Sequence, residues 1–335
     1  MAAGWQVHCP CTPILGGSLP LLEPLLVFIL GLVGLLFGSH WAVGGALRLA
    51  EKWGWPAWVA GILLLALGTS LPELFVVLGS LPGYPQFALA TVMGSNGFNV
   101  GIVLGLLLLL LGDSNICRGG GRWGLLSLLL LGSFIASQAF RNPEALVWPS
   151  LRAMGICLIF LYAAAIFMLF RAGDKESVVS QNFHPLSFAL FQTLGGFALL
   201  AFASGFFLDG SLQLAARIGW TEGFAGFFIA AVGTSSPELF TCWQVMRKGH
   251  PEAVYGNILG SNLFNLLLVG GLVAVSGATP DSSAVSGPLA VNAGAALALV
   301  VVPLVLRFPQ AALSRATGAI LLLAYFYSAN QVLSG

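Results

Sequence analysis

The chain has 335 residues, of which 58% are hydrophobic and only 7% are charged, and its formal net charge is +1 at pH 7. A soluble globular domain carries about 25% charged residues, so this composition excludes a soluble protein and places the chain in a bilayer. We expect no nucleic-acid partner.

Stretches of roughly 20 apolar residues, the length that crosses ~30 Å of hydrocarbon as a helix, recur along the whole chain. The polar turns between them are too short to hold a separate soluble domain. The first twenty residues contain no Lys or Arg and no signal-peptide layout, so they read as a tail before the first helix. We therefore predict an all-α polytopic membrane protein with ten transmembrane helices, near 22–49, 56–79, 85–112, 123–139, 148–170, 186–215, 222–246, 251–276, 288–306 and 313–331.

The loops show a charge bias that predicts orientation. If successive turns alternate sides, the loops after the odd-numbered helices hold nine Lys and Arg residues, and the other loops hold three. By the positive-inside rule, the richer side is cytoplasmic. We therefore expect both termini outside the cytoplasm of a prokaryotic plasma membrane.

The second half of the chain repeats the first. Residues 45–75 match residues 210–240 without a gap at 16 of 31 positions, and "GSNGFN" at 94–99 recurs as "GSNLFN" at 260–265. Five helices per half is an odd number, so the second half enters the membrane from the opposite side, as in many secondary transporters. We predict two inverted five-helix repeats, residues 1–171 and 186–335, joined by a cytoplasmic linker at 172–185.

The repeated motif places a carboxylate inside an otherwise uncharged apolar run. Glu73 lies in "GTSLPELF" at 68–75, and Glu238 lies in "GTSSPELF" at 233–240. A single such residue could be a protonated or hydrogen-bonded packing residue, but duplication weakens that interpretation, and intramembrane carboxylates are functional by default because burial is costly.

Proline in each motif predicts freed backbone oxygens. Pro72 and Pro237 lack an N–H, and their rings clash with the carbonyl four residues back. We expect the helices to break at Gly68 and Thr69 and at Gly233 and Thr234. Inside a membrane, such irregular backbone is tolerated where it lines a polar cavity, and its carbonyls are natural ligands for hard cations.

Hydroxyl and amide side chains share helix faces with these carboxylates or with one another at spacings of three or four residues. All of them are oxygen donors, which suit Ca²⁺ and Na⁺, whereas thiolate or imidazole would indicate zinc or copper. Taken alone, Ser95 and Ser261 are about as well explained by hydrogen bonds to their own helices as by binding of an ion. The candidates are Ser70 with Glu73, Ser95 with Asn99, Ser235 with Glu238, and Ser261 with Asn265.

The paired motifs and the ten-helix layout resemble the cation/Ca²⁺ exchanger superfamily, close to the prokaryotic sodium/calcium exchangers. The resemblance implies that Glu73 and Glu238 bind Ca²⁺ and share Na⁺. Asn at position 265, where some relatives have Asp, resembles the potassium-independent branch. The implied further ligands are the carbonyls of Thr69 and Thr234 for Ca²⁺, the serines Ser70, Ser95, Ser235 and Ser261 with the carbonyls of Ala66 and Ala231 for Na⁺, and Asn99 and Asn265 beside the centre.

The resulting hypothesis is an antiporter that exchanges Na⁺ for Ca²⁺ by alternating access around one midplane site. Ca²⁺ and Na⁺ are the transported ions, no organic cofactor is implied, and one chain supplies both halves of the site. Without a G-x-x-x-x-G-K-[ST] loop we expect no nucleotide. A proton/cation exchanger of the same superfamily is the nearest alternative, followed by a cation channel. An intramembrane enzyme is disfavoured, because the motifs contain no nucleophile paired with a base.

Other ionisable and thiol residues receive ordinary interpretations. We expect His40 to be a satisfied interior histidine and Asp209 to pair locally near a helix end. Cys9 and Cys11 read as unpaired thiols, because C-x-C alone is a weak signal; the remaining cysteines, Cys117, Cys157 and Cys242, read as loop or packing residues.

Overall fold

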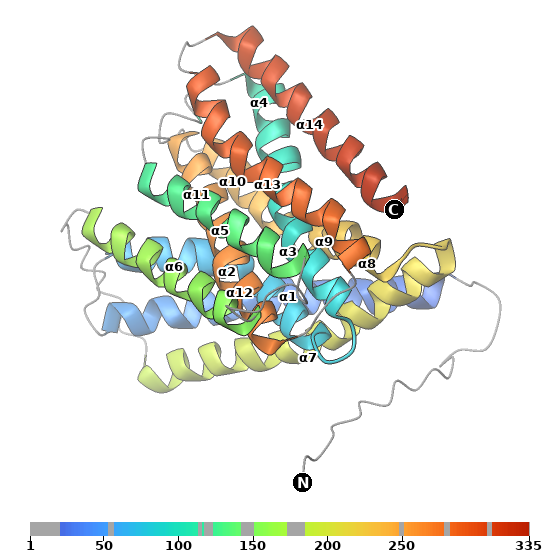
Figure 1. Cartoon of the computed structure of the whole chain (residues 1–335). Coiled ribbons are helices and arrows are strands. Elements are labelled where there is room, and N and C mark those ends of the chain that lie inside the picture. The colour runs from blue at the N-terminus through green and yellow to red at the C-terminus, as the bar shows by residue number, and fades with distance from the viewer. Residues whose placement is uncertain are drawn as a thin grey trace.

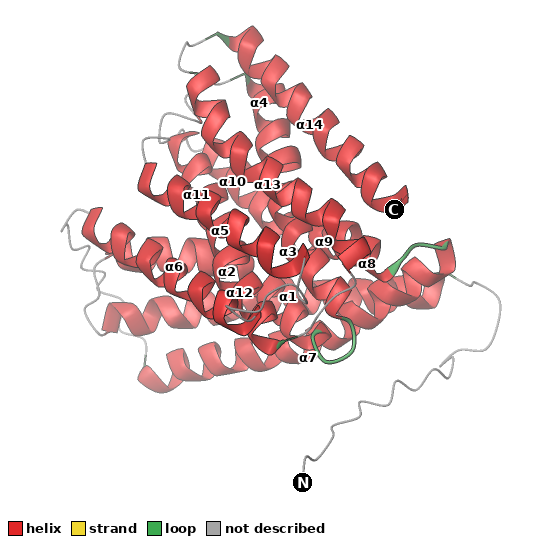
Figure 2. Ribbon diagram, in the orientation of Figure 1, coloured by secondary structure: helices red, strands yellow, loops and turns green. Residues whose placement is uncertain are grey.

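A computed structural model provides the structure of the chain. It describes residues 21–52, 57–112, 116, 123–141, 151–172, 185–247, 251–277, 282–306 and 310–334, and for residues 57–68 it describes the backbone alone. Cys9, Cys11, Cys117 and residues 173–184 of the predicted linker at 172–185 lie outside these ranges. Every element with defined bounds in the described part is helical (Figure 2).

The described helices follow one another as ten rods of membrane length (Figure 1). Seven of the described helices are by themselves long and apolar enough to cross a bilayer. The expected fold class is therefore confirmed. The rods are α1 (Leu22–Lys52), α2 (Ala57–Ser80), α3–η1–α4 (Pro85–Phe98, Asn99–Leu104, Gly105–Leu111), α5 (Trp123–Arg141), α6 (Leu151–Ala172), α7 (Leu186–Ile218), α8–η3–α9–α10 (Glu222–Phe224, Ala225–Ala230, Ala231–Thr234, Ser236–Arg247), α11–η4–α12 (Pro251–Leu263, Phe264–Val269, Gly270–Ser276), α13 (Ser282–Val305) and α14 (Ala311–Ser334).

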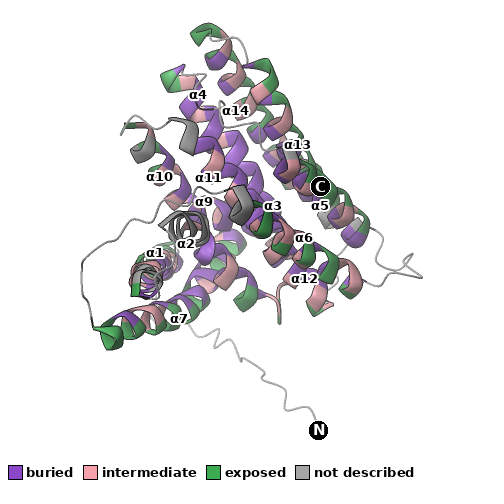
Figure 3. Cartoon of the chain, turned by 90° about the vertical axis from the view of Figure 1, so that its left-hand side faces the viewer, coloured by how far each residue is buried: buried purple, intermediate pink, exposed green. Residues whose placement is uncertain are grey.

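Two equivalent rods occupy the centre of the bundle. In the most apolar window of the α3–η1–α4 rod 72% of residues are buried, and in the α11–η4–α12 rod 78% are, against 28% for α1 and for α7. Figure 3 shows the buried residues gathered along α3 and α11. Each of these central rods carries one copy of the "GSNxFN" motif, so the motif lies where lipid does not reach.

The long helices α1 and α7 pack against each other as an antiparallel pair at the side of this centre (Figure 1). The approach is close because glycines face the partner backbone: a Cβ on Gly31 would overlap the backbone of Phe207, and a Cβ on Gly196 would overlap that of Ala42. Small residues at such crossings let membrane helices gain van der Waals contact.

Equivalent glycines end the two central rods. Gly112 follows α4 with φ of 65°, and Gly277 follows α12 with φ of 75°. Only glycine adopts this left-handed conformation at low cost, so it is the usual residue at a helix C-terminus. The repeat thus extends to the local geometry of the helix ends.

The expected helix break at Pro72 is wrong, and the break at Pro237 is displaced. Helix α2 continues from Ala57 to Ser80 through Pro72, whereas the second half breaks at Ser235, between α9 and α10. A proline removes only its own N–H bond, so curvature of the helix can absorb the ring clash without ending it. In the second half the π-helical segment η3 comes shortly before the break.

Candidate functional site

The two glutamates lie on α2 and α10, and each is tied to the opposite half of the chain. Ser70 Oγ donates to Glu238 Oε1 at 3.1 Å, and Ser235 Oγ donates to Glu73 Oε1 at 2.8 Å. All four side chains have no exposed surface. The pair therefore forms one buried site rather than two independent ones, with each repeat supplying a hydroxyl to the other repeat's carboxylate.

Several oxygen atoms around this pair are buried without a partner among the described residues. They are Oε2 of Glu73, Oε2 of Glu238 and the hydroxyl of Ser95; the hydroxyl of Ser261 on α11 is likewise buried without a partner among these residues. Ser95 and Thr234 lie beside the Glu73 carboxylate, and Thr69 lies beside that of Glu238. Buried polar atoms are almost always hydrogen-bonded, so a cluster of unsatisfied oxygens indicates room for a ligand that accepts their lone pairs.

The predicted ligands among the threonines and alanines of the motif are backbone carbonyls, and the structure shows hydrogen bonds of some atoms of these residues. Thr234 Oγ1 donates to the carbonyl of Ala230 at 2.9 Å, so this hydroxyl serves its own helix. The carbonyl of Ala231 accepts from Ser235 N at 2.9 Å and keeps one lone pair. The side chain of Ala66 lies outside the described set. Pro237 has no N–H to offer the carbonyl of Gly233, the oxygen four residues earlier.

The asparagines of "GSNxFN" form a network that sequence reasoning did not find. Asn99 Nδ2 donates to Asn262 Oδ1 at 3.0 Å, and Asn262 Nδ2 donates to the Asn96 carbonyl at 3.3 Å. Asn96 Nδ2 in turn donates to Asn292 Oδ1 at 2.7 Å on α13, and Asn292 Nδ2 donates to Ser133 Oγ at 3.2 Å on α5. The duplicated Asn96 and Asn262 were visible in the motif, but nothing in the spacing pointed to α13 or α5.

The two predicted amides differ in their surroundings. Asn99 uses its Nδ2 within this network, and its Oδ1 is unpartnered, whereas neither polar side-chain atom of Asn265 has a partner within the described part of the chain. Both residues are fully buried, and each lies at the start of a π-helical segment, η1 at Asn99–Leu104 and η4 at Phe264–Val269. π-Helical turns occur frequently at functional sites.

The donor set is built from oxygen. The described residues contain no group of three or more His, Cys, Asp and Glu side chains that could hold a metal ion. Two carboxylates, four serine hydroxyls and amide or backbone carbonyls remain, which is the chemistry of hard cations. If both glutamates ionise, the site carries a charge of −2, which one divalent cation neutralises.

Residues outside the site are placed as follows. His40 is exposed on α1, so the expected interior histidine is wrong; the spacing of apolar residues did not reveal which face of α1 turns outward. Asp209 is half-buried on α7 and interacts with a neighbour. Cys157 is exposed on α6, and Cys242 is buried on α10.

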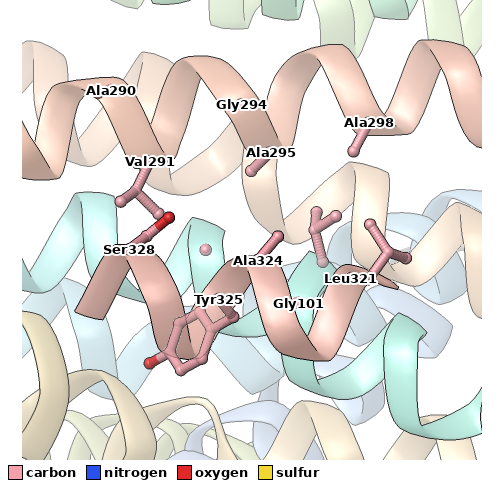
Figure 4. A pocket seen from close by; sticks show the side chains of 12 residues that line it. Gly101, Ala290, Val291, Gly294, Ala295, Ala298, Leu321, Ala324, Tyr325 and Ser328 are labelled. Atoms are coloured by element: carbon pink, nitrogen blue, oxygen red, sulfur yellow. The ribbon is translucent and has the colours of Figure 1, made fainter. Parts of the chain in front are cut away.

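A cavity of about 160 Å³ lies between α13, α14 and the rod of η1 (Figure 4). Its lining is mostly Gly, Ala and aliphatic residues, among them Gly101, Ala295 and Leu321, with Tyr325 at its edge. None of the glutamates, serines and asparagines of the predicted site lines this cavity, so it is separate from the site around the glutamates.

Comparison with known proteins places the chain among cation exchangers. The family model described as sodium/calcium exchanger protein matches residues 23–171 and 188–330. The inner membrane protein YrbG of Escherichia coli K12 is 30% identical over 267 residues, which cover 74% of this chain and 78% of YrbG.

Two solved structures share the fold. The sodium-calcium exchanger NCX_Mj, in a crystal soaked with Na⁺ and Sr²⁺, superposes with a TM-score of 0.57 at 25% identity and covers 92% of this chain and 98% of that one. The H⁺/Ca²⁺ exchanger CAX superposes with a TM-score of 0.65 at 17% identity, with 93% and 89% covered. At that identity the likeness to CAX concerns the fold alone.

Proposed function

Because the chain belongs to the sodium/calcium exchanger protein family, we propose that it exchanges Na⁺ for Ca²⁺ at the site around Glu73 and Glu238. The chain is a multi-pass membrane antiporter of the cation/Ca²⁺ exchanger superfamily, a transporter and not an enzyme. The identity of the coupling ion is the proposed part.

One observation carries the proposal, namely the pair of buried carboxylates that the two halves supply to one site. Each glutamate has one oxygen bonded to a serine of the other half and one oxygen unpartnered among the described residues. Uncompensated charge in a membrane interior is expensive. The empty site is therefore unfavourable when both groups are ionised, and Ca²⁺ or Na⁺ relieves the cost.

We assign the ligands from the likeness to the sodium/calcium exchanger family and from the places of these residues in the two repeated motifs. Ca²⁺ takes oxygen from Glu73 and Glu238 and from the carbonyls of Thr69 and Thr234. Na⁺ ions share the same carboxylates, and Asn99 and Asn265 lie beside the centre. The remaining Na⁺ ligands are the hydroxyls of Ser70, Ser95, Ser235 and Ser261 and the carbonyls of Ala66 and Ala231.

Exchange follows from competition at one site. The protein changes between its inward-open and outward-open states only when Na⁺ or Ca²⁺ occupies the site. Downhill entry of Na⁺ then drives Ca²⁺ outward without ATP. Because α2 and α10 meet through the hydrogen bonds between halves, the site belongs to both repeats. We further propose a prokaryotic plasma membrane, with both termini outside the cytoplasm, from the Lys and Arg distribution.

The test is Ca²⁺ uptake into vesicles that contain the purified protein. Vesicles loaded with Na⁺ and diluted into Na⁺-free medium should take up Ca²⁺, and vesicles loaded with choline should not. Internal K⁺ should not replace Na⁺. Uptake that is equal with Na⁺ and choline inside would refute sodium coupling.

A proton/Ca²⁺ exchanger is the second candidate, because the same observation supports it: a carboxylate that releases Ca²⁺ can bind H⁺ instead. The two candidates separate in a single preparation. Uptake driven by an imposed pH gradient without Na⁺ would favour H⁺ coupling, whereas uptake driven by Na⁺ with the pH clamped on both sides supports Na⁺ coupling.

A further inference from the structure

Two polar residues continue from the central site along the second half of the molecule. Cys242 lies four residues after Glu238 on α10, and Asn257 lies four residues before Ser261 on α11, so each shares a helix face with a residue of the site. Asn257 Nδ2 donates to Cys242 Sγ at 3.4 Å. The pair thus joins α10 and α11 one helical turn from the carboxylate, toward the connection at 248–250.

The pair is buried and incompletely satisfied. Cys242 has no exposed surface, and Asn257 is 6% exposed. Within the described residues, Asn257 Oδ1 has no hydrogen-bond partner. An amide oxygen held in this way without a partner requires an explanation, and an ion or water that passes beside it supplies one.

The first half lacks this pair. The equivalent positions, offset by 165 and 166 residues, are Val77 on α2 and Thr91 on α3, both fully buried. Val77 has no polar atom in its side chain, and Thr91 Oγ1 donates to the carbonyl of Phe87 at 2.7 Å in its own helix. At these two positions the first half therefore has no free polar side-chain atom, whereas the second half has Asn257 Oδ1.

We propose that Cys242 and Asn257 form a passage step through which cations enter or leave the central site toward the α10–α11 connection. The inference rests on the proposed function, because it requires a cation at Glu73 and Glu238. The positive-inside count predicts that this end is cytoplasmic. Val77 and Thr91 give the opposite direction no equivalent step.

The chemistry of the pair suits passage rather than tight binding. The amide oxygen of Asn257 is neutral, so it offers a cation partial replacement for water without the charge that would retain it, while Cys242 Sγ accepts from Nδ2 and holds the amide in place. The thiol adds a readout that the carboxylate site lacks: sulfur reagents attack only a thiolate that they can reach, so reaction at the buried Cys242 requires that a passage to it opens. Methyl methanethiosulfonate transfers its methylthio group to the sulfur, releases methanesulfinate, and leaves a disulfide-linked group in the passage.

The experiment compares initial Ca²⁺ uptake by wild type, Cys242→Val and Cys242→Ser in Na⁺-loaded vesicles. Valine is the residue of the first half, and it should lower the maximal rate about tenfold, because Asn257 Nδ2 loses its acceptor and the amide oxygen that the ion passes is no longer held in place. The KM for Ca²⁺ should change less than about twofold, since Glu73 and Glu238 stay in place. Serine restores a hydrogen-bonding group, so this variant should transport faster than the valine variant.

Thiol modification gives a second readout. The reagent should slow wild-type uptake about tenfold, and each variant without the thiol should keep its own untreated rate. Cys157→Ser is the matched control, because Cys157 is an exposed thiol on α6; this variant should be as fast and as sensitive as wild type. Asn257→Thr introduces the first-half residue and should also lower the maximal rate.

Three results would decide against the proposal. Cys242→Val with wild-type rates, or reagent sensitivity that persists in Cys242→Ser, would place Cys242 off the route of the ion. A parallel loss of Ca²⁺ binding by purified, folded Cys242→Val would show that the residue acts on the central site itself. Absence of any Ca²⁺ flux from wild type under Na⁺ and pH gradients would refute the proposed function.

Discussion

In the first half of the molecule Glu73 accepts a hydrogen bond from Ser235 at 2.8 Å, and in the second half Glu238 accepts one from Ser70 at 3.1 Å. One helical turn away the halves differ, because Val77 occupies the first-half position that is equivalent to Cys242 in the second half. Helix α2 is also continuous where the second half breaks at Ser235. The two halves thus have the same residues and hydrogen bonds at the carboxylates, and they differ one helical turn away from them.

The largest expected effect removes either carboxylate. Glu73→Gln should reduce Ca²⁺ transport by at least about 100-fold, because the amide keeps the size and one oxygen but removes the charge that a divalent ion needs. Glu238→Gln should match it, since the two residues occupy equivalent positions. Ca²⁺ uptake into Na⁺-loaded vesicles measures both variants. Near-normal transport in either variant would refute the model in which both glutamates bind the same ion.

A smaller effect tests the hydrogen bonds between halves. Ser70→Ala and Ser235→Ala each remove the donor from the other half's glutamate, and a hydrogen bond to a charged group is worth about 1.5–3 kcal/mol. Each variant should therefore lower uptake at limiting Ca²⁺ at least about tenfold.

Equality of the two serine variants is the informative result. Ser137 is a half-buried serine on α5 whose Oγ donates to the carbonyl of Phe134 in its own helix, so Ser137→Ala serves as a control that should leave uptake unchanged. If Ser70→Ala is silent while Ser235→Ala is not, then the apparent symmetry at the carboxylates does not extend to their energetics.

The sequence predicted the fold because apolar runs of membrane length define helices without knowledge of their neighbours. It predicted Glu73 and Glu238 because a charge in such a run is conspicuous. It did not predict the bonds from Asn96 to Asn292 or from Asn292 to Ser133, because helical spacing identifies the residues on one face but not the helix that lies opposite. The continuity of α2 through Pro72 depends likewise on local curvature.

A third comparison concerns the start of helix α3. Glu222 Oε1 accepts from Phe87 N at 3.1 Å, which satisfies one N–H at the N-terminus of that helix. The position equivalent to Glu222 in the first half is Ala57, which has no acceptor. Glu222→Ala should cost about 1 kcal/mol, as for a lost N-terminal cap, and lower the melting temperature in detergent.

The conservative variant separates the cap from other effects of Glu222. Glu222→Gln keeps a side-chain oxygen and should recover most of the lost stability, whereas an equal loss in both variants would assign the effect to charge. Glu23 is an acidic residue in the first turn of α1, and Glu23→Gln supplies a control for general removal of charge.

The smallest effect compares the two amides beside the centre. Asn265 has both side-chain polar atoms unpartnered among the described residues, whereas Asn99 Nδ2 is bonded to Asn262. An Asp at 265 therefore breaks no bond and adds a carboxylate near two others, where it must take up a proton or an extra cation. Asn265→Asp should keep exchange within about threefold of wild type while making it more sensitive to pH or to K⁺.

Asn99→Asp should cost more, because the new carboxylate oxygen would face Asn262 Oδ1 and two acceptors repel. The data are initial uptake rates of both variants and wild type between about pH 6 and 8.5, with and without K⁺, across the range in which a raised carboxyl pKa would titrate. If wild type already requires K⁺, the likeness to the potassium-independent branch misleads. If Asn265→Asp has wild-type uptake rates in every condition while Asn99→Asp does not, only the amide of the first half faces the ions. The two halves would then be equivalent at the carboxylates and serines but not at the amides.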